Sequence, residues 1–285
     1  MASAMVLDHI VVNTRHDLNI AEANFAALGF TLTPRGYHTL GSMNALAVFE
    51  RDYLELIGVP VTRPVLRPEI VTAAMGLNGL VIKTDDADET YAHLKSIGVC
   101  NAPPNAFSRP LHLSDGSSHE VKFRTVSVRP DAFPAGRLYF CEHLTPELVW
   151  RREWQEHDNG ALRFENVVFV TDGPSRTIDK LAAILKTHCN ADDGDNLCVE
   201  LAGEFNLRFL TQRKFENEFA HIIAAGAAAP ELELPIEFGA LTIKGSLSTE
   251  LIERLRMDQH FCVCEQGDRT DVWVKSVRTL LSFVA

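Results

Sequence analysis

The chain has 285 residues, of which 46% are hydrophobic and 23% charged, and this ordinary globular composition excludes a disordered or fibrous chain. Acidic residues number 38 against 27 lysines and arginines, so the formal charge at pH 7 is −11. This balance argues against broad binding to nucleic acids or anionic membranes, which usually requires a basic face. No apolar stretch approaches the roughly 20 residues that span a bilayer.

Cysteine usage indicates the redox compartment. The six cysteines are scattered and form no CxxC pair; they are Cys100, Cys141, Cys189, Cys198, Cys262 and Cys264. Cys262 and Cys264 lie two residues apart, a spacing that suits neither a common zinc knuckle nor a redox pair. We therefore expect reduced, mostly buried thiols in a cytoplasmic protein.

An internal repeat organises the chain. Four similar segments, each a short β-branched run that ends in polar residues, begin at intervals of 70 to 87 residues and span 7–14, 77–84, 164–171 and 238–245. Each pattern predicts a buried strand. A helical pattern follows each run, over 18–28, 91–97, 178–185 and 251–255.

Further strands complete each repeat. They are expected over 45–49 and 53–59, then 120–128 and 138–142, then 197–201 and 206–211, and finally 261–265, 271–277 and 280–284. The third repeat adds a helix-like stretch, 214–225, and a linker, 227–235. Each unit is thus of the type βαββ(β).

One helix on one sheet face cannot close a core, so the units are expected to pair. We predict an α+β protein in which repeated βαβββ units form two half-barrel domains, residues 1–150 and 161–285. The polar stretch 151–160 lies between them.

The first unit carries a family resemblance. Its opening Leu7-Asp8-His9-Ile10-Val11-Val12, its runs 28–38 and 41–44, Phe49 and Tyr53-Leu54-Glu55-Leu56 resemble the vicinal oxygen chelate superfamily, which includes glyoxalases, bleomycin-resistance proteins and extradiol dioxygenases. Within it the sequence is similar to the glyoxalase-like branch. The resemblance covers about residues 5–160.

The resemblance implies a cupped half-barrel in each domain. Metal-using members hold one divalent ion in the cup, on ligands from the first and last strands of each unit, and their substrates chelate it through two adjacent oxygens. Other members are metal-free drug-binding proteins, so the fold does not fix the reaction.

Two residues match the family's ligand positions. The resemblance implies a metal-binding histidine at His9 and a metal-binding glutamate at Glu55. Strand alternation places His9 on one face with Leu7 and Val11. A carboxylate beside apolar neighbours is costly to bury unless it is paired or coordinating. The alternatives are a hydrogen-bonded core histidine and a solvent-facing edge glutamate.

The other units depart from the family pattern. Gly79, Asn166 and Ala240 occupy the positions that correspond to His9, and neither C-terminal unit has the usual histidine. We therefore expect no catalytic metal in the C-terminal domain and a structural or dimerising role for it.

A replacement ligand is available at the end of the second unit. Glu142 and His143 point to opposite faces of an extended strand, so only one of them enters the cup. With His143 the site has two histidines and one carboxylate, which suits Fe(II), Mn(II) or Zn(II). With Glu142 the site has one histidine and two carboxylates, a harder ligand set that is more suited to Mn or Mg. Alternatively, both belong to a domain-linking turn.

His38 and Asn44 are the catalytic candidates. They lie in a polar segment that would line the cup entrance, and histidine is the natural proton carrier near neutral pH. The alternative is a surface loop held by Asn and Gly turn chemistry.

The leading hypothesis is a metal-dependent enzyme of lyase, isomerase or dioxygenase type that acts on a small molecule with adjacent oxygens. His9, Glu55 and His143 would hold Fe, Mn, Zn or Ni. The alternative is a metal-free protein that sequesters a small molecule, and a homodimer through exposed strand edges is one expectation. The metal hypothesis requires His9 and Glu55 to face each other within about 4 Å.

Overall fold

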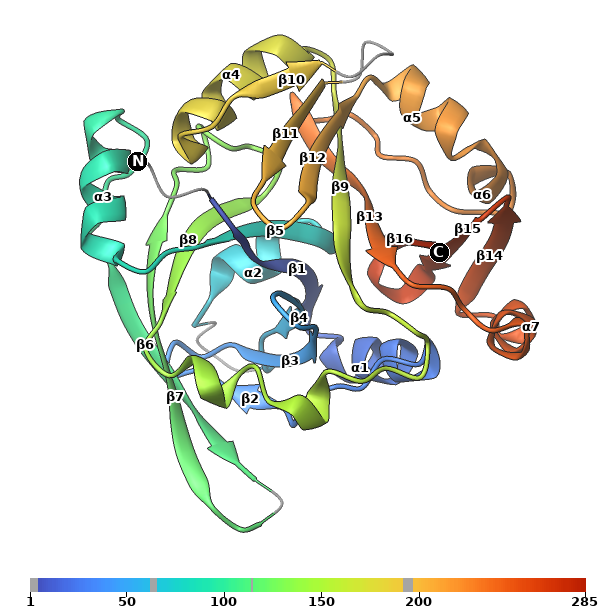
Figure 1. The fold of residues 1–285 in the computed structure, drawn as a ribbon, viewed down its shortest axis with the longest axis horizontal. Helices are drawn as coiled ribbons and strands as arrows, with labels where there is room; N and C mark the ends of the chain where they lie inside the picture. Colours follow the sequence, from blue (N-terminus) through green and yellow to red (C-terminus); the bar gives the residue numbers. More distant parts are fainter. Residues whose placement is uncertain (1–4, 62–65, 114, 192–196) are drawn as a thin grey trace.

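In the computed structural model, which describes residues 5–61, 66–113, 115–191 and 197–285, the chain forms two eight-stranded sheets with the same strand order. The first runs β2-β3-β4-β1-β5-β8-β7-β6 and the second β10-β11-β12-β9-β13-β16-β15-β14. Figure 1 shows the two sheets side by side, the N-terminal half in blue and green and the C-terminal half in yellow to red. The predicted α+β fold of paired half-barrels is confirmed.

The first sheet contains β1 (Leu7–Arg15), β2 (Gly36–Tyr37), β3 (Met43–Val48), β4 (Tyr53–Gly58), β5 (Gly76–Lys83), β6 (Asn105–His112), β7 (Ser118–Ser127) and β8 (Arg137–His143). The second contains β9 (Arg163–Thr171), β10 (Cys189–Ala191), β11 (Leu197–Leu201), β12 (Phe205–Leu210), β13 (Ile236–Lys244), β14 (Phe261–Gln266), β15 (Arg269–Val274) and β16 (Thr279–Val284). In each sheet the first strands of the two units pair antiparallel at the centre, β1 with β5 and β9 with β13.

The helices are α1 (Leu18–Ala27), α2 (Pro68–Thr72), α3 (Ala87–Ser96), α4 (Pro174–Leu185), α5 (Gln212–Glu218), α6 (Ala220–Ala224) and α7 (Thr249–Met257). The helix predicted over 214–225 is thus two short helices. Asp86 begins α3, and its side chain accepts from the backbone N–H groups of Asp88 and Glu89. β2, β6, β10 and α2 were not predicted. β6 forms with β7 the long hairpin at the lower edge of Figure 1.

One large core joins the two halves. It contains apolar residues from both sheets and from helices of both halves, among them Ile10, Phe25, Phe169 and Leu281. The cup face of each sheet has a smaller cluster of its own. In the C-terminal half, apolar side chains of α5, α6 and the junction between them fill the cup. They are Phe215, Phe219 and Ile222. The two cups therefore differ in what occupies them.

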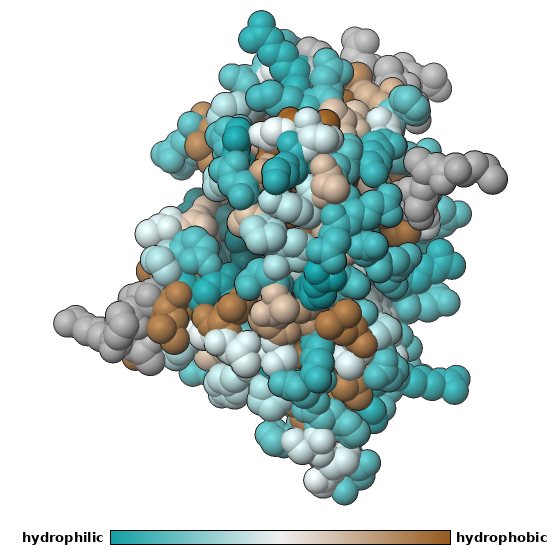
Figure 2. Space-filling view, turned by 90° about the vertical axis from the view of Figure 1, so that its left-hand side faces the viewer, coloured by the Kyte–Doolittle hydropathy of each residue, from teal (hydrophilic) through white to brown (hydrophobic). Residues whose placement is uncertain are grey.

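The outer surface is mainly polar. On the face drawn in Figure 2, hydrophilic side chains cover most of the surface, and apolar side chains gather in a band across its lower half. Among the described residues, no helix has the length and apolar character needed to cross a membrane.

Candidate active site

A β-bulge at the start of β1 brings two polar side chains into the N-terminal cup. The pairing of β1 with β5 shifts register between Leu7 and His9, so Asp8 is an extra residue without its own partner. Leu7 packs in the central core, whereas Asp8 bonds the ring of His9. The prediction that His9 shares a face with Leu7 was therefore wrong, because the bulge interrupts the alternation.

Asp8 orients the imidazole of His9. His9 Nδ1 lies 2.5 Å from Asp8 Oδ1, and since the carboxylate only accepts, Nδ1 carries the proton. The lone pair of Nε2 then points into the cup, 3.0 Å from the hydroxyl of Tyr139 and 3.7 Å from Oε2 of Glu55. The ring of Tyr53 stacks on the imidazole at 4.3 Å. His9 and Glu55 thus meet within the predicted distance.

Glu55 is a buried, ionised carboxylate on β4, with 5% of its surface exposed. Its Oε1 accepts a hydrogen bond of 2.6 Å from Asn44 Nδ2 on the neighbouring strand β3. Burial on its own raises the pKa of Glu55, but the positive charge that His9 and His38 carry when protonated and the hydrogen bond from Asn44 lower it further than burial raises it.

The two residues predicted to be catalytic lie beside Glu55. His38 Nδ1 contacts Ser42 Oγ at 2.8 Å, and His38 Nε2 lies 3.3 Å from Asn44 Nδ2. Burial lowers the pKa of His38 to about 4, against the opposing effect of Glu55, so this imidazole is neutral at pH 7. The structure therefore brings His9, Glu55, His38 and Asn44 together in one cup.

His143 lies on the other side of Asp8. Its Nε2 is 3.0 Å from the Asp8 carboxylate, which therefore bridges two histidines. Burial tends to raise the pKa of Asp8, but the effects of His143 and His9 are larger and lower it. Among the described residues, the ligand atoms of Asp8, Cys141 and His143 come within 4.8 Å of one another, whereas His9, Glu55 and His143 do not converge in this way.

Glu142 points away from the cup. Its carboxylate pairs with Arg124 at 3.1 Å and accepts from the backbone N–H of Ala87 at the start of α3. This follows from strand alternation, since Glu142 and His143 occupy opposite faces of β8.

The register of the parallel pairs identifies the true counterpart of Glu55. Glu55 on β4 lies opposite Val11, two residues after His9 on β1. In the second unit, Tyr139 on β8 lies opposite Val81, two residues after Gly79 on β5. The positions of His9 and Glu55 thus correspond to those of Gly79 and Tyr139. Counting register from the two strand openings would have found Tyr139, which sequence reasoning missed in favour of the end of the strand.

A cavity of about 450 Å³ fills the N-terminal cup above these residues. Phe107, Phe123 and Leu46 contribute apolar walls, and Arg109 and Arg137 contribute positive charge. Arg109 is 1% exposed, and its Nε, Nη1 and Nη2 have no hydrogen-bond partner among the described residues. Arg109 escaped the sequence analysis because its strand, β6, was not predicted.

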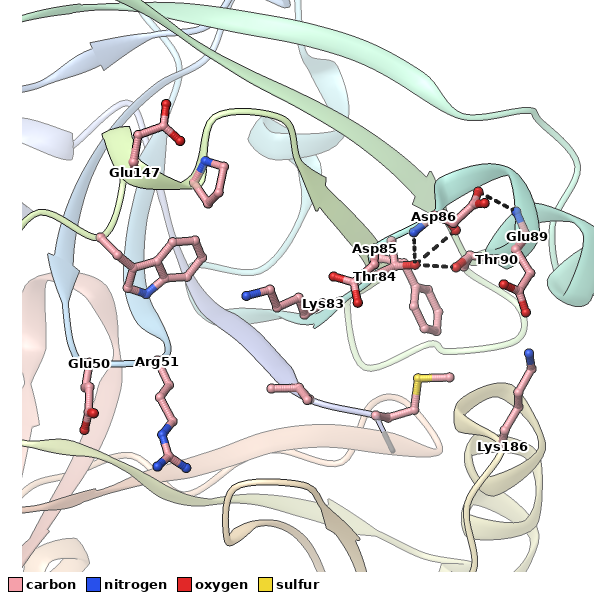
Figure 3. A pocket seen from close by; sticks show the side chains of 15 residues that line it. Glu50, Arg51, Lys83, Thr84, Asp85, Asp86, Glu89, Thr90, Glu147 and Lys186 are labelled. Atoms are coloured by element: carbon pink, nitrogen blue, oxygen red, sulfur yellow. Dashed lines mark hydrogen bonds between the residues drawn. The ribbon is translucent and has the colours of Figure 1, made fainter. Parts of the chain in front are cut away.

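A second, wider cleft of about 900 Å³ lies between the two halves. Figure 3 shows charged side chains of both signs around it, among them Lys83 from β5 of the N-terminal half and Lys186 next to α4 of the C-terminal half. Several of its polar groups are engaged locally: Thr84 bonds Thr90 at 2.7 Å, and Asp86 caps α3. His9 and Glu55 line the cup and not this cleft.

Comparison with known proteins agrees with this architecture. Residues 7–185 match the family described as the glyoxalase-like domain, and no curated protein gives a match. A hypothetical protein from Staphylococcus aureus has a similar structure, with a TM-score of 0.66, 12% identity and 98% of each chain covered.

Two further similar structures have enzyme names. A variant of 4-hydroxymandelate synthase from Streptomyces coelicolor has a TM-score of 0.52 at 9% identity, covering 99% of this chain and 92% of its own. A fusion of a xylose isomerase-like TIM barrel with 4-hydroxyphenylpyruvate dioxygenase has a TM-score of 0.55 at 11% identity, covering 99% of this chain and 50% of its own. At such identities the likeness concerns the fold.

Proposed function

Because the chain belongs to the glyoxalase-like domain family, we propose that its N-terminal cup is the active site of a metal-dependent enzyme of the vicinal oxygen chelate type. Its substrate is a small organic molecule with two adjacent oxygens. The observation that carries the proposal is the 3.7 Å approach of His9 Nε2 and Glu55 Oε2 inside a cavity.

The residues present fit a divalent ion. An imidazole nitrogen and an ionised carboxylate are ligands that suit Fe, Mn, Zn or Ni, and the donor set leaves positions for substrate oxygens. Asp8 holds His9 in the tautomer whose Nε2 is free to ligate, which is the support that metal-binding histidines generally have. Tyr139 contributes a hydroxyl at the position that corresponds to Glu55.

Bound to His9 and Glu55, the metal supplies Lewis-acid chemistry to the substrate oxygens. Asn44 fixes the orientation of Glu55 by donating to Oε1, and His38 lies beside the same amide. Since the pKa of His38 is about 4, we assign it a positioning role at neutral pH. Burial raises the pKa of Tyr139 well above its usual value, so its hydroxyl keeps its proton and acts as a donor.

A second candidate function is metal-free binding of a small molecule in the same cup. One observation favours it: the Tyr139 hydroxyl lies 3.0 Å from the Nε2 that a metal would require, and Gly79 offers no further ligand. In this case Asp8, His9 and Tyr139 serve as a hydrogen-bonding wall of the pocket.

Metal content decides between the two. We expect near-stoichiometric Fe, Mn, Zn or Ni in the untagged protein by mass spectrometry, with loss in His9→Ala and in Glu55→Ala. The control is His119→Ala, an exposed histidine outside the cup, which should keep the metal. Absence of metal after reconstitution with each ion would contradict the enzyme proposal and leave the binding function.

A further variant tests where the ion is bound. Cys141→Ser removes a thiol from the cluster of Asp8, Cys141 and His143 without touching His9 or Glu55. Metal retained in this variant supports the site on His9 and Glu55. Metal lost here but kept in Glu55→Ala would move the ion to the cluster around Asp8.

A further inference from the structure

We infer that the cup binds a carboxylate-bearing molecule, an organic acid with an apolar body, whose carboxylate pairs with Arg109. The inference rests on the proposed function only in using the same cup, and it names the class of substrate. It starts from a guanidinium that is buried in the wall of the cavity beside His9 and Glu55.

Arg109 has no protein counter-ion. Only 1% of the residue is exposed, and within the described part of the chain none of its three guanidinium nitrogens has a hydrogen bond or an acidic group within ion-pair distance, 4.0 Å. Burying an unpaired charge is costly, and this cost shows in the pKa of Arg109, which burial lowers. A ligand that supplies the missing negative charge removes this cost.

The backbone opposite Arg109 leaves space for its side chain to lie in the cup. A Cβ atom on Gly36 would approach Cδ of Arg109 to 2.6 Å and Nη1 to 3.0 Å, so a larger residue at this point of β2 would displace the Arg109 side chain. Arg109 lies close enough to Glu55 to feel its charge, yet the two form no ion pair. The guanidinium is therefore held inside the cup without being neutralised there.

The shape and charge of the cup favour a carboxylate over a phosphate. A planar guanidinium binds a planar carboxylate through two parallel hydrogen bonds. A phosphate dianion brings two negative charges into a cavity that already contains the ionised Glu55, and it requires more donors than one buried guanidinium provides. Two other arginines line the cavity, and both are partly exposed. Arg67 pairs with Glu69, and Arg137 lies against the ring of Tyr139 at 5.9 Å.

The remaining wall indicates an apolar or aromatic body. The rings of Phe107 and Phe123 stack at 5.2 Å, and the edge of His38 meets Phe107 at 5.3 Å. Leucine and valine side chains complete this wall, and the cavity of about 450 Å³ limits the guest to a small molecule. A pocket with one charged group and an aromatic wall around it fits a small aryl or alkyl carboxylic acid.

Calorimetric titration of the full-length protein with three matched compounds tests the inference. The compounds are 3-phenylpropanoate, its neutral amide 3-phenylpropanamide, and the dianion phenyl phosphate. We expect the acid to bind and the amide to bind about 30-fold more weakly, since a buried charge is then left unpaired. Equal binding of acid and amide, no binding of the acid, or tighter binding of phenyl phosphate would overturn the carboxylate assignment.

Two arginine variants locate the anchor. Arg109→Met keeps the length of the side chain without its charge, and we expect the acid to bind about 30-fold more weakly to it while the amide is unaffected. Arg129→Met is the matched control, because Arg129 pairs with Asp131 outside the cup. This variant should bind the acid as the wild type does. Unchanged binding of the acid to Arg109→Met would overturn the proposal.

Thermal denaturation distinguishes an anchor from a structural arginine. Without ligand, Arg109→Met should melt at or above the temperature of the wild type, because an unpaired buried charge has been removed. A lower melting temperature would show that Arg109 stabilises the fold and would count against the inference.

Running the titrations before and after EDTA treatment separates this inference from the proposed function. The contribution of Arg109 is expected in both forms, and Arg109→Met should keep the metal content of the wild type. Absence of metal with the dependence on Arg109 intact would contradict only the enzyme proposal. Metal present without dependence on Arg109 would contradict only the carboxylate inference.

Discussion

The two cups of this molecule have the same strand order but opposite contents. The N-terminal cup is a cavity with buried polar and charged residues, whereas Phe215, Phe219 and Ile222 fill the C-terminal cup from α5 and α6. The difference arises in the connection between the two units of each half. The chain builds α5 and α6 between β12 and β13, but only the five-residue helix α2 is described between β4 and β5.

Corresponding positions have changed along with the contents. By strand register, Asn166 on β9 takes the place of His9, and Arg208 on β12 takes that of Glu55. Arg208 bonds the carboxylate of Glu218 on α5 at 2.9 Å. Where one cup presents a carboxylate to its cavity, the other has an arginine that binds the helix covering it. The same fold thus forms a cup in both halves, and the segment that contains α5 and α6 converts the C-terminal cup from an open cavity into a packed core.

The sharpest test of this contrast is the same substitution in both cups. Phe215→Ala should lower the free energy of unfolding by about 3–5 kcal/mol, because it empties a packed core. Phe107→Ala, in the wall of the open cavity, should cost about 1 kcal/mol, since this side chain is already partly exposed. Urea denaturation of both variants measures the difference, and equal losses would show that the two cups are packed alike.

The second test concerns Asp8, whose carboxylate bridges His9 and His143. Among the described residues, the C-terminal cup has no such carboxylate between two histidines. Asp8→Asn should weaken metal affinity about 10- to 100-fold, because it removes the carboxylate that orients His9. Competition with a chromogenic chelator gives the affinity, and circular dichroism verifies the fold. Unchanged affinity would mean that Asp8 only stabilises β1.

The third test addresses the joint between the halves. Asp52, in the turn before β4, accepts from the backbone N–H of Phe164 on β9, and burial raises the pKa of Asp52 to about 7. Folding therefore favours its protonated form, and the resulting stability is present below pH 4 and lost as the pH rises through about 7. Asp52→Asn, which imitates the protonated form, should be up to about 2 kcal/mol more stable than the wild type at pH 8.

This advantage of Asp52→Asn should shrink as the pH falls toward the usual aspartate pKa of 3.8, below which both states of the wild type hold the proton. Paired melting curves of the two proteins from pH 4 to pH 8 test the sign. A difference that does not change with pH would contradict the raised pKa of Asp52.

The smallest effect is expected at Glu142, the carboxylate that points away from the cup. Glu142→Gln weakens the pair with Arg124 and should change the stability by less than about 1 kcal/mol. Metal content should stay at the level of the wild type. Loss of metal here would indicate that β8 presents its other face to the ion.

Periodicity and repeats predicted most of the fold, because the strands and helices of all four units follow simple patterns of burial. They missed β6, whose pattern includes a proline and exposed polar residues, so they also missed Arg109. Of the site, the family positions pointed to His9 and Glu55, and the structure brings these two residues within 3.7 Å of each other.

The partners of these residues depend on features that single-sequence patterns do not reveal. The bulge that turns Asp8 toward His9 comes from strand pairing, and Tyr139 is identified only by its register against β5. His143 lies on the face of β8 opposite Glu142, but Asp8 stands between it and His9. Local pattern thus predicts which face a residue occupies, whereas pairing decides which atoms meet.

Gly79, which has no side chain, limits how the ligand set of this cup can evolve. Gly79 lies directly opposite Val11, and a Cβ atom there would approach the side chain of Val11 to 2.8 Å. Installing a histidine at 79 therefore requires a smaller residue at 11 in advance. The two substitutions are epistatic, with the order of events fixed by sterics, so a lineage with valine at 11 is separated from the two-histidine site by a destabilised intermediate.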